Sequence, residues 1–397
     1  MPDPARVLIF DTTLRDGEQA AGVAFSARDK LEIAERLAAA RVDVIEAGFP
    51  VSSRAELEAV QGVARQVRDA RICALARAVP KDVEAAGEAL RGAAAPRIHV
   101  FVNASDVQLA HQLRATREGV VGMVAAMVAR ARDFTDDVEF SPMDATRADR
   151  GFVAELAGTA LRAGARTLNV PDTVGFALPD AVRALCAWLR AEVPGLSDAV
   201  LSFHGQDDLG LATANSLAAI AGGARQVELA VNGIGERAGN TPFEEVVMAL
   251  RVHGPALGVT TGVDARAIHG LSRLVAERSG IAVPPNKAVV GGNAFRHASG
   301  IHQDGVLKER TTFECFDPAE IGHPEGTQIV LGKLSGRAGF AARVAQLGYR
   351  LDERCLARAF ARFQALAASG VRVGDDELRA LCEEGPARPS ARALALR

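Results

Sequence analysis

The feature that most constrains the fold of this chain is a strand-like run that recurs eight times within its first 240 residues. Each run is short, apolar and rich in β-branched residues, and helical patterns such as residues 27–40 and 118–132 separate the runs. Strands that alternate with helices are parallel and have right-handed crossovers. Eight such units close a (β/α)₈ or TIM barrel, whereas a doubly wound sheet has about six strands. The expected strands cover residues 7–10, 42–45, 72–75, 98–102, 138–140, 167–170, 199–203 and 226–231.

Polar or glycine-rich segments directly follow most of these runs. In a barrel of parallel strands, the C-terminal strand ends form one face, and the active site is built on that face. Segments that are far apart in the sequence therefore converge on one mouth, where we expect an active site. The segments are residues 11–17, 46–50, 141–147, 171–175, 204–208 and 232–240.

The remainder of the chain departs from this rhythm. A barrel takes roughly 250 residues, and the chain has 397. We predict a catalytic barrel over residues 1–270, a linker subdomain over residues 271–334 and a small, mainly helical C-terminal subdomain over residues 335–397. The helical pattern in the last part extends from about residue 335 to residue 384.

Composition excludes several classes of protein. The net charge of −3, with Lys and Arg spread along the chain, gives no basic field for nucleic acid. Five scattered cysteines without a CxxC pair are typical of reduced thiols. No apolar run reaches the roughly 18 residues of a membrane helix, and the N-terminus lacks the apolar stretch of a signal peptide. We therefore expect a cytoplasmic protein with neither a nucleic-acid nor a membrane partner.

A set of oxygen and nitrogen ligands is expected at the barrel mouth. His204 and Gln206 are two residues apart at the end of the seventh run, so both side chains point the same way. Asp16 follows the first run and Asn240 ends the loop after the eighth, and the first and eighth strands are neighbours in a closed barrel. This oxygen-rich set favours Mg²⁺ or Mn²⁺, with Zn²⁺ as a further possibility. A histidine after a strand can also be a purely structural hydrogen-bonding residue.

Several longer motifs carry a resemblance to a known family. Asp-Thr-Thr-Leu-Arg-Asp-Gly-Glu-Gln at residues 11–19 resembles the opening signature of the 2-isopropylmalate synthase and homocitrate synthase family. Residues 209–215 and 232–240 resemble its second signature, and residues 299–305 and 331–337 resemble its C-terminal motifs. The resemblance covers roughly residues 5 to 350. It implies a barrel followed by subdomains that reach over the partner's active site in a homodimer.

The resemblance also implies a role for individual residues. Asp16, His204 and Asn240 would be metal ligands, with Gln206 as a fourth. Arg15 would polarise the keto oxygen of the substrate, and His302 would be a catalytic histidine that activates water. The thioester of acetyl-CoA, the co-substrate, would lie near the glycine loop of Gly233, Gly235 and Gly239. Substrate-binding positions would be Arg15, Gln19, Ser141, Met143 and Thr173.

Three positions depart from the pattern of the family. Gln206 stands where a second histidine is usual, Met143 replaces a glutamate, and Phe313 replaces a tyrosine. Loss of the glutamate would suit an anionic acceptor such as 2-oxoglutarate, oxaloacetate or phosphonopyruvate, because a buried like charge is costly. Alternatively, Met143 widens an apolar pocket for a branched 2-oxo acid. We favour the anionic acceptor.

The predicted function is an acyltransferase that condenses acetyl-CoA with a 2-oxo acid and then hydrolyses the thioester, giving a 2-substituted malate such as homocitrate. The alternative is a 2-isopropylmalate-type synthase. We also expect no leucine-regulatory domain, because the chain ends before one would fit. Two rivals are a non-catalytic paralogue that binds acyl-CoA or a 2-oxo acid, and a hydroxymethylglutaryl-CoA-type lyase. That lyase has a cysteine in the glycine loop, and residues 233–240 contain none.

Overall fold

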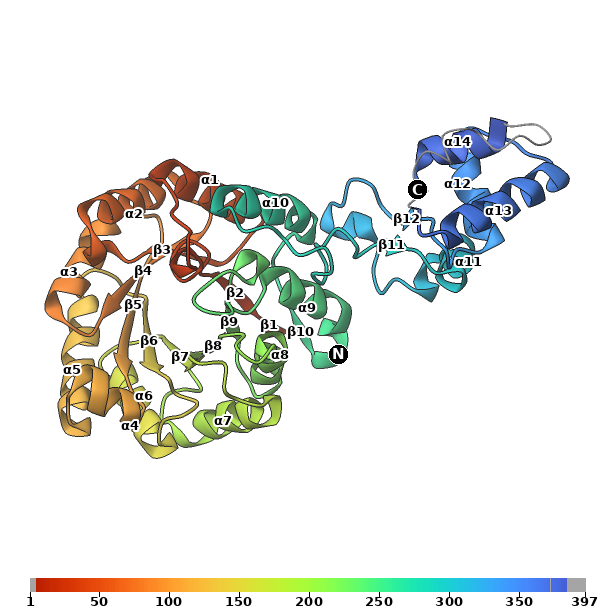
Figure 1. Cartoon of the computed structure of the whole chain (residues 1–397). Coiled ribbons are helices and arrows are strands. Elements are labelled where there is room, and N and C mark those ends of the chain that lie inside the picture. Colours follow the sequence, from red (N-terminus) through yellow and green to blue (C-terminus); the bar gives the residue numbers. More distant parts are fainter. Residues whose placement is uncertain (1–4, 372, 384–397) are drawn as a thin grey trace. The chain divides into compact units, whose positions relative to one another are not determined.

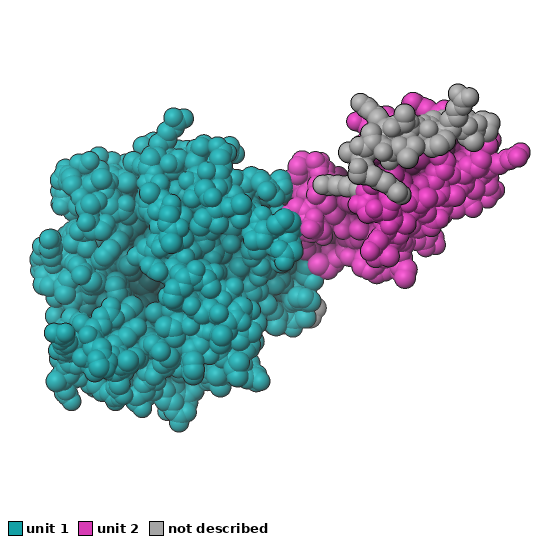
Figure 2. All heavy atoms as spheres, viewed as in Figure 1, with its two compact units in different colours: residues 1–291 teal, residues 292–397 magenta. Residues whose placement is uncertain are grey.

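A computed structural model describes residues 5–371 and 373–383. The chain divides into two compact units, Met1–Gly291 and Gly292–Arg397, which Figure 2 distinguishes by colour. Residues 384–397, the end of the predicted helical subdomain, lie outside the described residues. The three-part division at residues 270 and 334 stays a prediction.

Unit 1 is built around a closed barrel of eight parallel strands. Each strand overlaps one of the eight expected runs, so the predicted (β/α)₈ barrel is confirmed. The strands pair in sequence order and β2 closes the ring against β9, as Figure 1 shows. They are β2 (Leu8–Asp11), β3 (Val44–Gly48), β4 (Arg71–Arg77), β5 (Pro96–Asn103), β6 (Val138–Met143), β7 (Thr167–Asp172), β8 (Val200–Gly205) and β9 (Gln226–Leu229).

Helices surround the barrel, and their ends follow local sequence signals. Ser26 accepts a hydrogen bond from the backbone N–H of Asp29, whose carboxylate accepts in return from Ser26, so a capping box starts the first helix. Asp149 caps the N-terminus of α6 in a similar way. The main helices of unit 1 are α1 (Ala27–Ala39), α2 (Arg54–Gln66), α3 (Pro80–Ala89), α5 (Arg117–Ala131), α6 (Arg150–Arg162), α7 (Pro179–Glu192), α8 (Ala212–Ala221), α9 (Phe243–Leu257) and α10 (Ile268–Ser279).

A layer of buried polar side chains fills the barrel interior. Arg97 donates from Nη1 to Glu139 Oε2 over 2.9 Å and to Gln226 Oε1 over 2.8 Å. Gln226 Nε2 donates to Glu139 Oε1 over 2.8 Å and to Ser202 Oγ over 3.0 Å. A buried charge is tolerated only when it is paired, and here Arg97 and Glu139 pair with each other. The network fills the barrel interior below its mouth.

Unit 2 is mainly helical, as the sequence predicts. A two-residue parallel pair joins β11 (Arg296–His297) to β12 (Gln328–Ile329). The helices of this unit are α11 (Gly300–Lys308), α12 (Arg337–Gln346), α13 (Glu353–Ala368) and α14 (Asp375–Glu383). Phe340 and Phe363 are fully buried between α12 and α13 and centre an apolar core of its own.

The five cysteines are free thiols. Among the helices of the described residues, none combines the length and apolar character needed to cross a membrane.

Candidate active site

The C-terminal ends of the barrel strands surround a cavity of about 770 Å³. Figure 2 shows unit 1 hollowed at the centre of the barrel. The convergence that the sequence predicts is therefore present. The predicted site residues that line the cavity are Arg15, Asp16, Gln19, Ser141, Met143, Thr173, His204 and Gln206.

Arg15 and Asp16 lie on a turn that follows β2. Arg15 donates from Nε to Glu46 Oε2 over 2.6 Å and from Nη1 to Asp16 Oδ2 over 2.5 Å. Burial lowers the pKa of Arg15, but the charges of Glu46 and Asp16 outweigh burial and raise this pKa above its usual value. The guanidinium therefore presents a fixed positive charge to the cavity.

The four predicted metal ligands converge on one point. Asn240 Nδ2 lies 3.1 Å and Gln206 Nε2 lies 3.4 Å from Asp16 Oδ1. His204 Nε2 lies 4.0 Å from Asp16 Oδ2 and 3.1 Å from Gln206 Nε2. Burial raises the pKa of Asp16, but the neighbouring Arg15 and His204 bring it below its usual value, so Asp16 is an anion.

The amide oxygens of this cluster fit a cation. Gln206 Oε1 and Asn240 Oδ1 are buried and have no hydrogen-bond partner, although an orphaned buried acceptor is costly. The oxygen and nitrogen of an amide exchange places on a half-turn of its terminal torsion. Gln206 can therefore present its oxygen beside the Asp16 carboxylate and the His204 imidazole. Asn240 can do the same once its Nδ2 leaves Ile234 O, to which it also donates over 3.0 Å. One anion, one imidazole and two amide oxygens form a donor set suited to a divalent cation.

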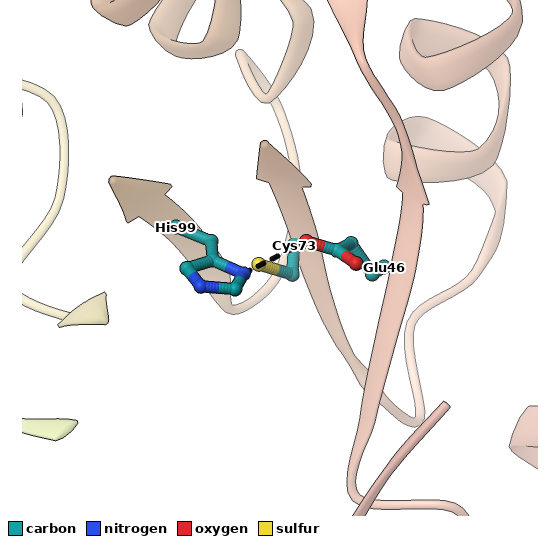
Figure 3. A group of neighbouring side chains, drawn as sticks. All are labelled: Glu46, Cys73 and His99. Carbon is teal, nitrogen blue, oxygen red and sulfur yellow. Dashed lines mark hydrogen bonds and ion pairs between the residues drawn. The ribbon is translucent and has the colours of Figure 1, made fainter. Parts of the chain in front are cut away.

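A second buried group lies deeper in the barrel, where Glu46, Cys73 and His99 have potential ligand atoms within 4.8 Å of one another (Figure 3). Both nitrogens of His99 are already engaged, Nδ1 with Glu46 Oε1 at 2.9 Å and Nε2 with Ser141 Oγ at 2.7 Å. Burial, reinforced by the Glu46 charge, raises the pKa of the Cys73 thiol well above its usual value. The group therefore suits a hydrogen-bonded support for Arg15 better than a metal site.

Sequence reasoning missed His99, Glu46 and Glu228 as site residues. His204 Nδ1 lies 2.8 Å from Glu228 Oε2, so this carboxylate orients the imidazole. The available signal was a polar residue at every second position of otherwise apolar strands, as in Arg97 and His99 on β5. Strand alternation places such residues together inside the barrel.

The predicted substrate-binding residues lie on neighbouring strand ends. Thr173 Oγ1 accepts a hydrogen bond from the backbone N–H of Asp144 over 2.9 Å. Ser141 accepts from Asn169 Nδ2 over 2.9 Å in addition to its contact with His99. Met143 is partly exposed and pairs in register with Asn103 of β5. These positions form one wall of the cavity.

The glycine loop after β9 is tightly folded. A Cβ on Gly239 would lie 1.9 Å from Gly233 O, and one on Gly235 would lie 2.2 Å from Asn240 Nδ2. Gly233 and Gly239 also have φ values of 69° and 100°, which side chains disfavour. These glycines let the chain turn closely enough to bring Asn240 to Asp16.

His302 belongs to unit 2 and lies on α11. Its ring stacks on that of Phe313, with centroids 4.0 Å apart and an interplanar angle of 17°. The structure therefore pairs His302 with Phe313, one of the three positions at which the sequence is expected to depart from the family. The predicted contact between His302 and a barrel site of a partner subunit stays a prediction.

These features define a (β/α)₈-barrel protein with a candidate cation site at the strand ends. The chain belongs to the HMGL-like family, whose model matches residues 6–275. A second model, described as homocitrate synthase post-HMGL domain-like, matches residues 289–371. The predicted family and the predicted class, acyl-CoA-dependent transferases, are thus confirmed.

Relatives that match 96% of this chain are named 2-isopropylmalate synthases. The chain is 50% identical to that of Syntrophus aciditrophicus over 379 residues, which are 96% of this chain and 73% of the relative. It is 51% identical to that of Pyrococcus furiosus, covering 96% of this chain and 76% of the relative. A solved hydroxymethylglutaryl-CoA lyase of Pseudomonas aeruginosa matches with a TM-score of 0.61 and 25% identity over 71% of this chain and 96% of the lyase.

Proposed function

We propose that the chain condenses acetyl-CoA with a 2-oxo acid and hydrolyses the resulting thioester to release CoA and a 2-substituted malate. The observation that carries this proposal is the position of the Arg15 guanidinium beside Asp16, His204 and Gln206 in one cavity, with Asn240 in contact with Asp16. The guanidinium and a cation held by the cluster would both bind a substrate that has a keto oxygen next to a carboxylate. The names of the relatives support the same reaction class.

Asp16, His204, Gln206 and Asn240 would hold a divalent cation, with Mg²⁺ or Mn²⁺ favoured over Zn²⁺ because the set is rich in oxygen. When bound, that cation would polarise the keto group of the 2-oxo acid. Glu228 holds the His204 Nδ1 hydrogen and so directs Nε2 into the cluster. Such an orienting carboxylate is usual behind a histidine ligand.

Arg15 donates a charge-assisted hydrogen bond to the keto oxygen and stabilises the alkoxide that develops there. Its Nε stays bound to Glu46, which keeps the guanidinium plane fixed during the reaction. The Thr173 hydroxyl binds the carboxylate of the 2-oxo acid, and Gln19 and Ser141 complete that end of the cavity. The glycine loop of Gly233–Gly239 lies beside the thioester.

For the acceptor, we propose a branched, apolar 2-oxo acid. This is the alternative of the sequence analysis, which favours an anionic acceptor. Leu113, Met123 and Met143 give one part of the cavity an apolar lining, and Asn103 beside Met143 uses its amide hydrogens on Gln108 and Gln112. The 2-isopropylmalate synthase relatives favour the same acceptor. Two further arginines line the cavity, but Arg77 is paired with Asp82 and Arg237 with Asp208, so a second anionic group would have to compete with these carboxylates.

A homodimer is part of the proposal. Ile301, Phe313 and Leu334 lie around His302 in unit 2 and are 77%, 42% and 71% exposed. Exposed apolar side chains of this size gather where a protein binds a partner. We propose that a second copy covers this face and that His302 thereby reaches its barrel mouth to activate water. Free cysteines are consistent with a cytoplasmic enzyme.

The test measures CoA release from acetyl-CoA with 2-oxoisovalerate, 2-oxoglutarate, oxaloacetate and phosphonopyruvate, each with Mg²⁺, Mn²⁺ or Zn²⁺. We expect release with 2-oxoisovalerate and loss of metal-dependent turnover in His204→Ala. CoA release with none of the acceptors would refute the condensation and favour a protein that only binds these ligands. Release only with the anionic acceptors would refute the apolar acceptor alone.

A further inference from the structure

Lys30 on α1 holds a buried ammonium that the proposed reaction does not use. Only 1% of its side chain is exposed. Nζ lies 2.7 and 2.8 Å from the two carboxylate oxygens of Glu56 and 2.7 Å from Glu18 Oε2. It also donates to two backbone carbonyls, Leu14 O at 3.1 Å and Ala47 O at 3.3 Å. Five oxygen atoms of four groups thus meet at one cation.

The two backbone carbonyls belong to the sequence neighbours of Arg15 and Glu46, which are paired with each other. Leu14 immediately precedes Arg15, and Ala47 immediately follows Glu46. The same ammonium therefore binds the residue before Arg15 and the residue after Glu46, and Arg15 and Glu46 are 2.6 Å apart. The remaining carboxylate, Glu18, lies two residues after Asp16 and also accepts the backbone N–H of Phe25 over 3.0 Å.

The surroundings are shaped to hold the ammonium in this place. Glu56 accepts the backbone N–H of Phe49, a residue of the cavity lining, over 3.0 Å. A Cβ on Gly48 would lie 1.9 Å from Glu56 Oε1 and 3.0 Å from Lys30 Nζ, so the strand can approach this closely only with glycine there. A buried ion pair does little for stability compared with apolar packing. We therefore look for the role of Lys30 in the positions of the segments that it binds.

We propose that Lys30 is a positioning residue, which through Leu14 O, Ala47 O and Glu18 sets the Arg15–Asp16 turn against Glu46 for the condensation. The inference rests on the proposed function for its kinetic readout. A displacement of about 1 Å in a reacting group can cost roughly 10²-fold in rate. Lys30 is thus placed to affect turnover without contacting a substrate.

The experiment compares Lys30→Met, the double variant Lys30→Met/Glu56→Gln, and Arg278→Met. Lys30→Met leaves the Glu56 carboxylate buried without its cation, and the double variant removes that charge. A loss of turnover that persists in the double variant is therefore due to lost positioning and not to the unpaired charge. Arg278 is a matched control because it binds the same helix, α1, through Asp29 and Glu32 at 3.3 and 3.0 Å but does not contact the turn. Steady-state kinetics are combined with amide hydrogen exchange of residues 14–19.

We expect kcat/KM for the 2-oxo acid to fall roughly 10²-fold in Lys30→Met, with KM for acetyl-CoA nearly unchanged. Amides of residues 14–19 should exchange faster, and the double variant should regain thermal stability but not turnover. Arg278→Met should keep wild-type turnover. Wild-type turnover in either Lys30 variant would overturn the inference. If the wild type releases no CoA with any acceptor, the proposed function fails, and unchanged exchange of residues 14–19 would then still overturn the positioning role.

Discussion

His204 Nδ1 donates to Glu228 Oε2 over 2.8 Å, and this contact turns Nε2 of the same imidazole toward Asp16. Burial lowers the pKa of His204, but the hydrogen bond and charge of Glu228 raise it above its usual value. The two residues lie on the adjacent strands β8 and β9. The pairing of two neighbouring barrel strands therefore fixes the orientation of the His204 ring, a predicted metal ligand.

Replacing Glu228 tests this orientation. We expect Glu228→Gln to weaken Mn²⁺ binding roughly 10- to 100-fold, because a carboxylate behind a histidine ligand fixes the ring and raises its basicity. Electron paramagnetic resonance of free Mn²⁺ gives the affinity directly. Glu314→Gln is a matched control, since Glu314 pairs with His297 in unit 2 at 2.9 Å. Equal Mn²⁺ affinity in wild type and Glu228→Gln would remove the orienting role.

Gln206 offers a second test of the cation site. Gln206→His should raise the affinity for Zn²⁺ relative to Mg²⁺ by about tenfold or more, which is about 1.4 kcal/mol, because zinc prefers nitrogen ligands. Gln206→Leu should weaken all three cations. Isothermal titration with each metal measures the change. If neither substitution alters the binding of any cation, Gln206 is not a ligand.

The acid stability of unit 1 should depend on Glu46. Burial raises the pKa of Glu46, but the Arg15 charge and the His99 and Thr12 hydrogen bonds lower it to about 2, from 4.5. A depressed pKa stabilises the fold above pH 4.5, and this contribution is lost as the pH falls toward 2. Glu46→Gln should therefore cost up to about 3 kcal/mol at pH 7 and progressively less below pH 4.5.

Fluorescence of Trp188 during urea unfolding reports on this effect in unit 1, because Trp188 on α7 is the single tryptophan. The metal-free protein avoids a contribution from cation binding. A difference between wild type and Glu46→Gln that stays constant from pH 7 to pH 3 would contradict the assigned ionisation.

Met143 should govern the choice of acceptor. Met143→Glu introduces a carboxylate beside Asn103, so kcat/KM for 2-oxoglutarate should fall more than kcat/KM for 2-oxoisovalerate, because the new charge repels the second carboxylate. Met143→Leu keeps the volume and should preserve the ratio. The measurement is the ratio of the two values of kcat/KM. An unchanged ratio in Met143→Glu would place Met143 away from the variable end of the acceptor.

The apolar face of unit 2 predicts self-association. Ile301→Asp/Leu334→Asp should convert a dimer into a monomer, because charges replace the most exposed apolar side chains next to His302. Sedimentation velocity gives the mass, and circular dichroism checks that both units stay folded. A wild type that sediments as a monomer at micromolar concentration would contradict the homodimer.

Much of the site could be predicted because it depends on strand ends. Asp16, His204 and Gln206 were expected to meet from the order of the strands, and they lie within 4.0 Å of one another. Lys30 could not be predicted. Its five contacts come from α2, β3 and the turn after β2, and nothing in a local pattern distinguishes it from a solvated lysine on a helix.

The sequence by itself determined the order of the eight strands, the face on which the polar segments gather and the chemical types of the predicted ligands. It could do so because parallel strands joined by right-handed crossovers leave their C-terminal ends on one side. Only the tertiary structure decided that Glu46 of β3 reaches His99 of β5 across β4, and that Glu228 stands behind His204. Those contacts depend on inter-strand register and on the direction of buried side chains, which are set by closure of the whole barrel.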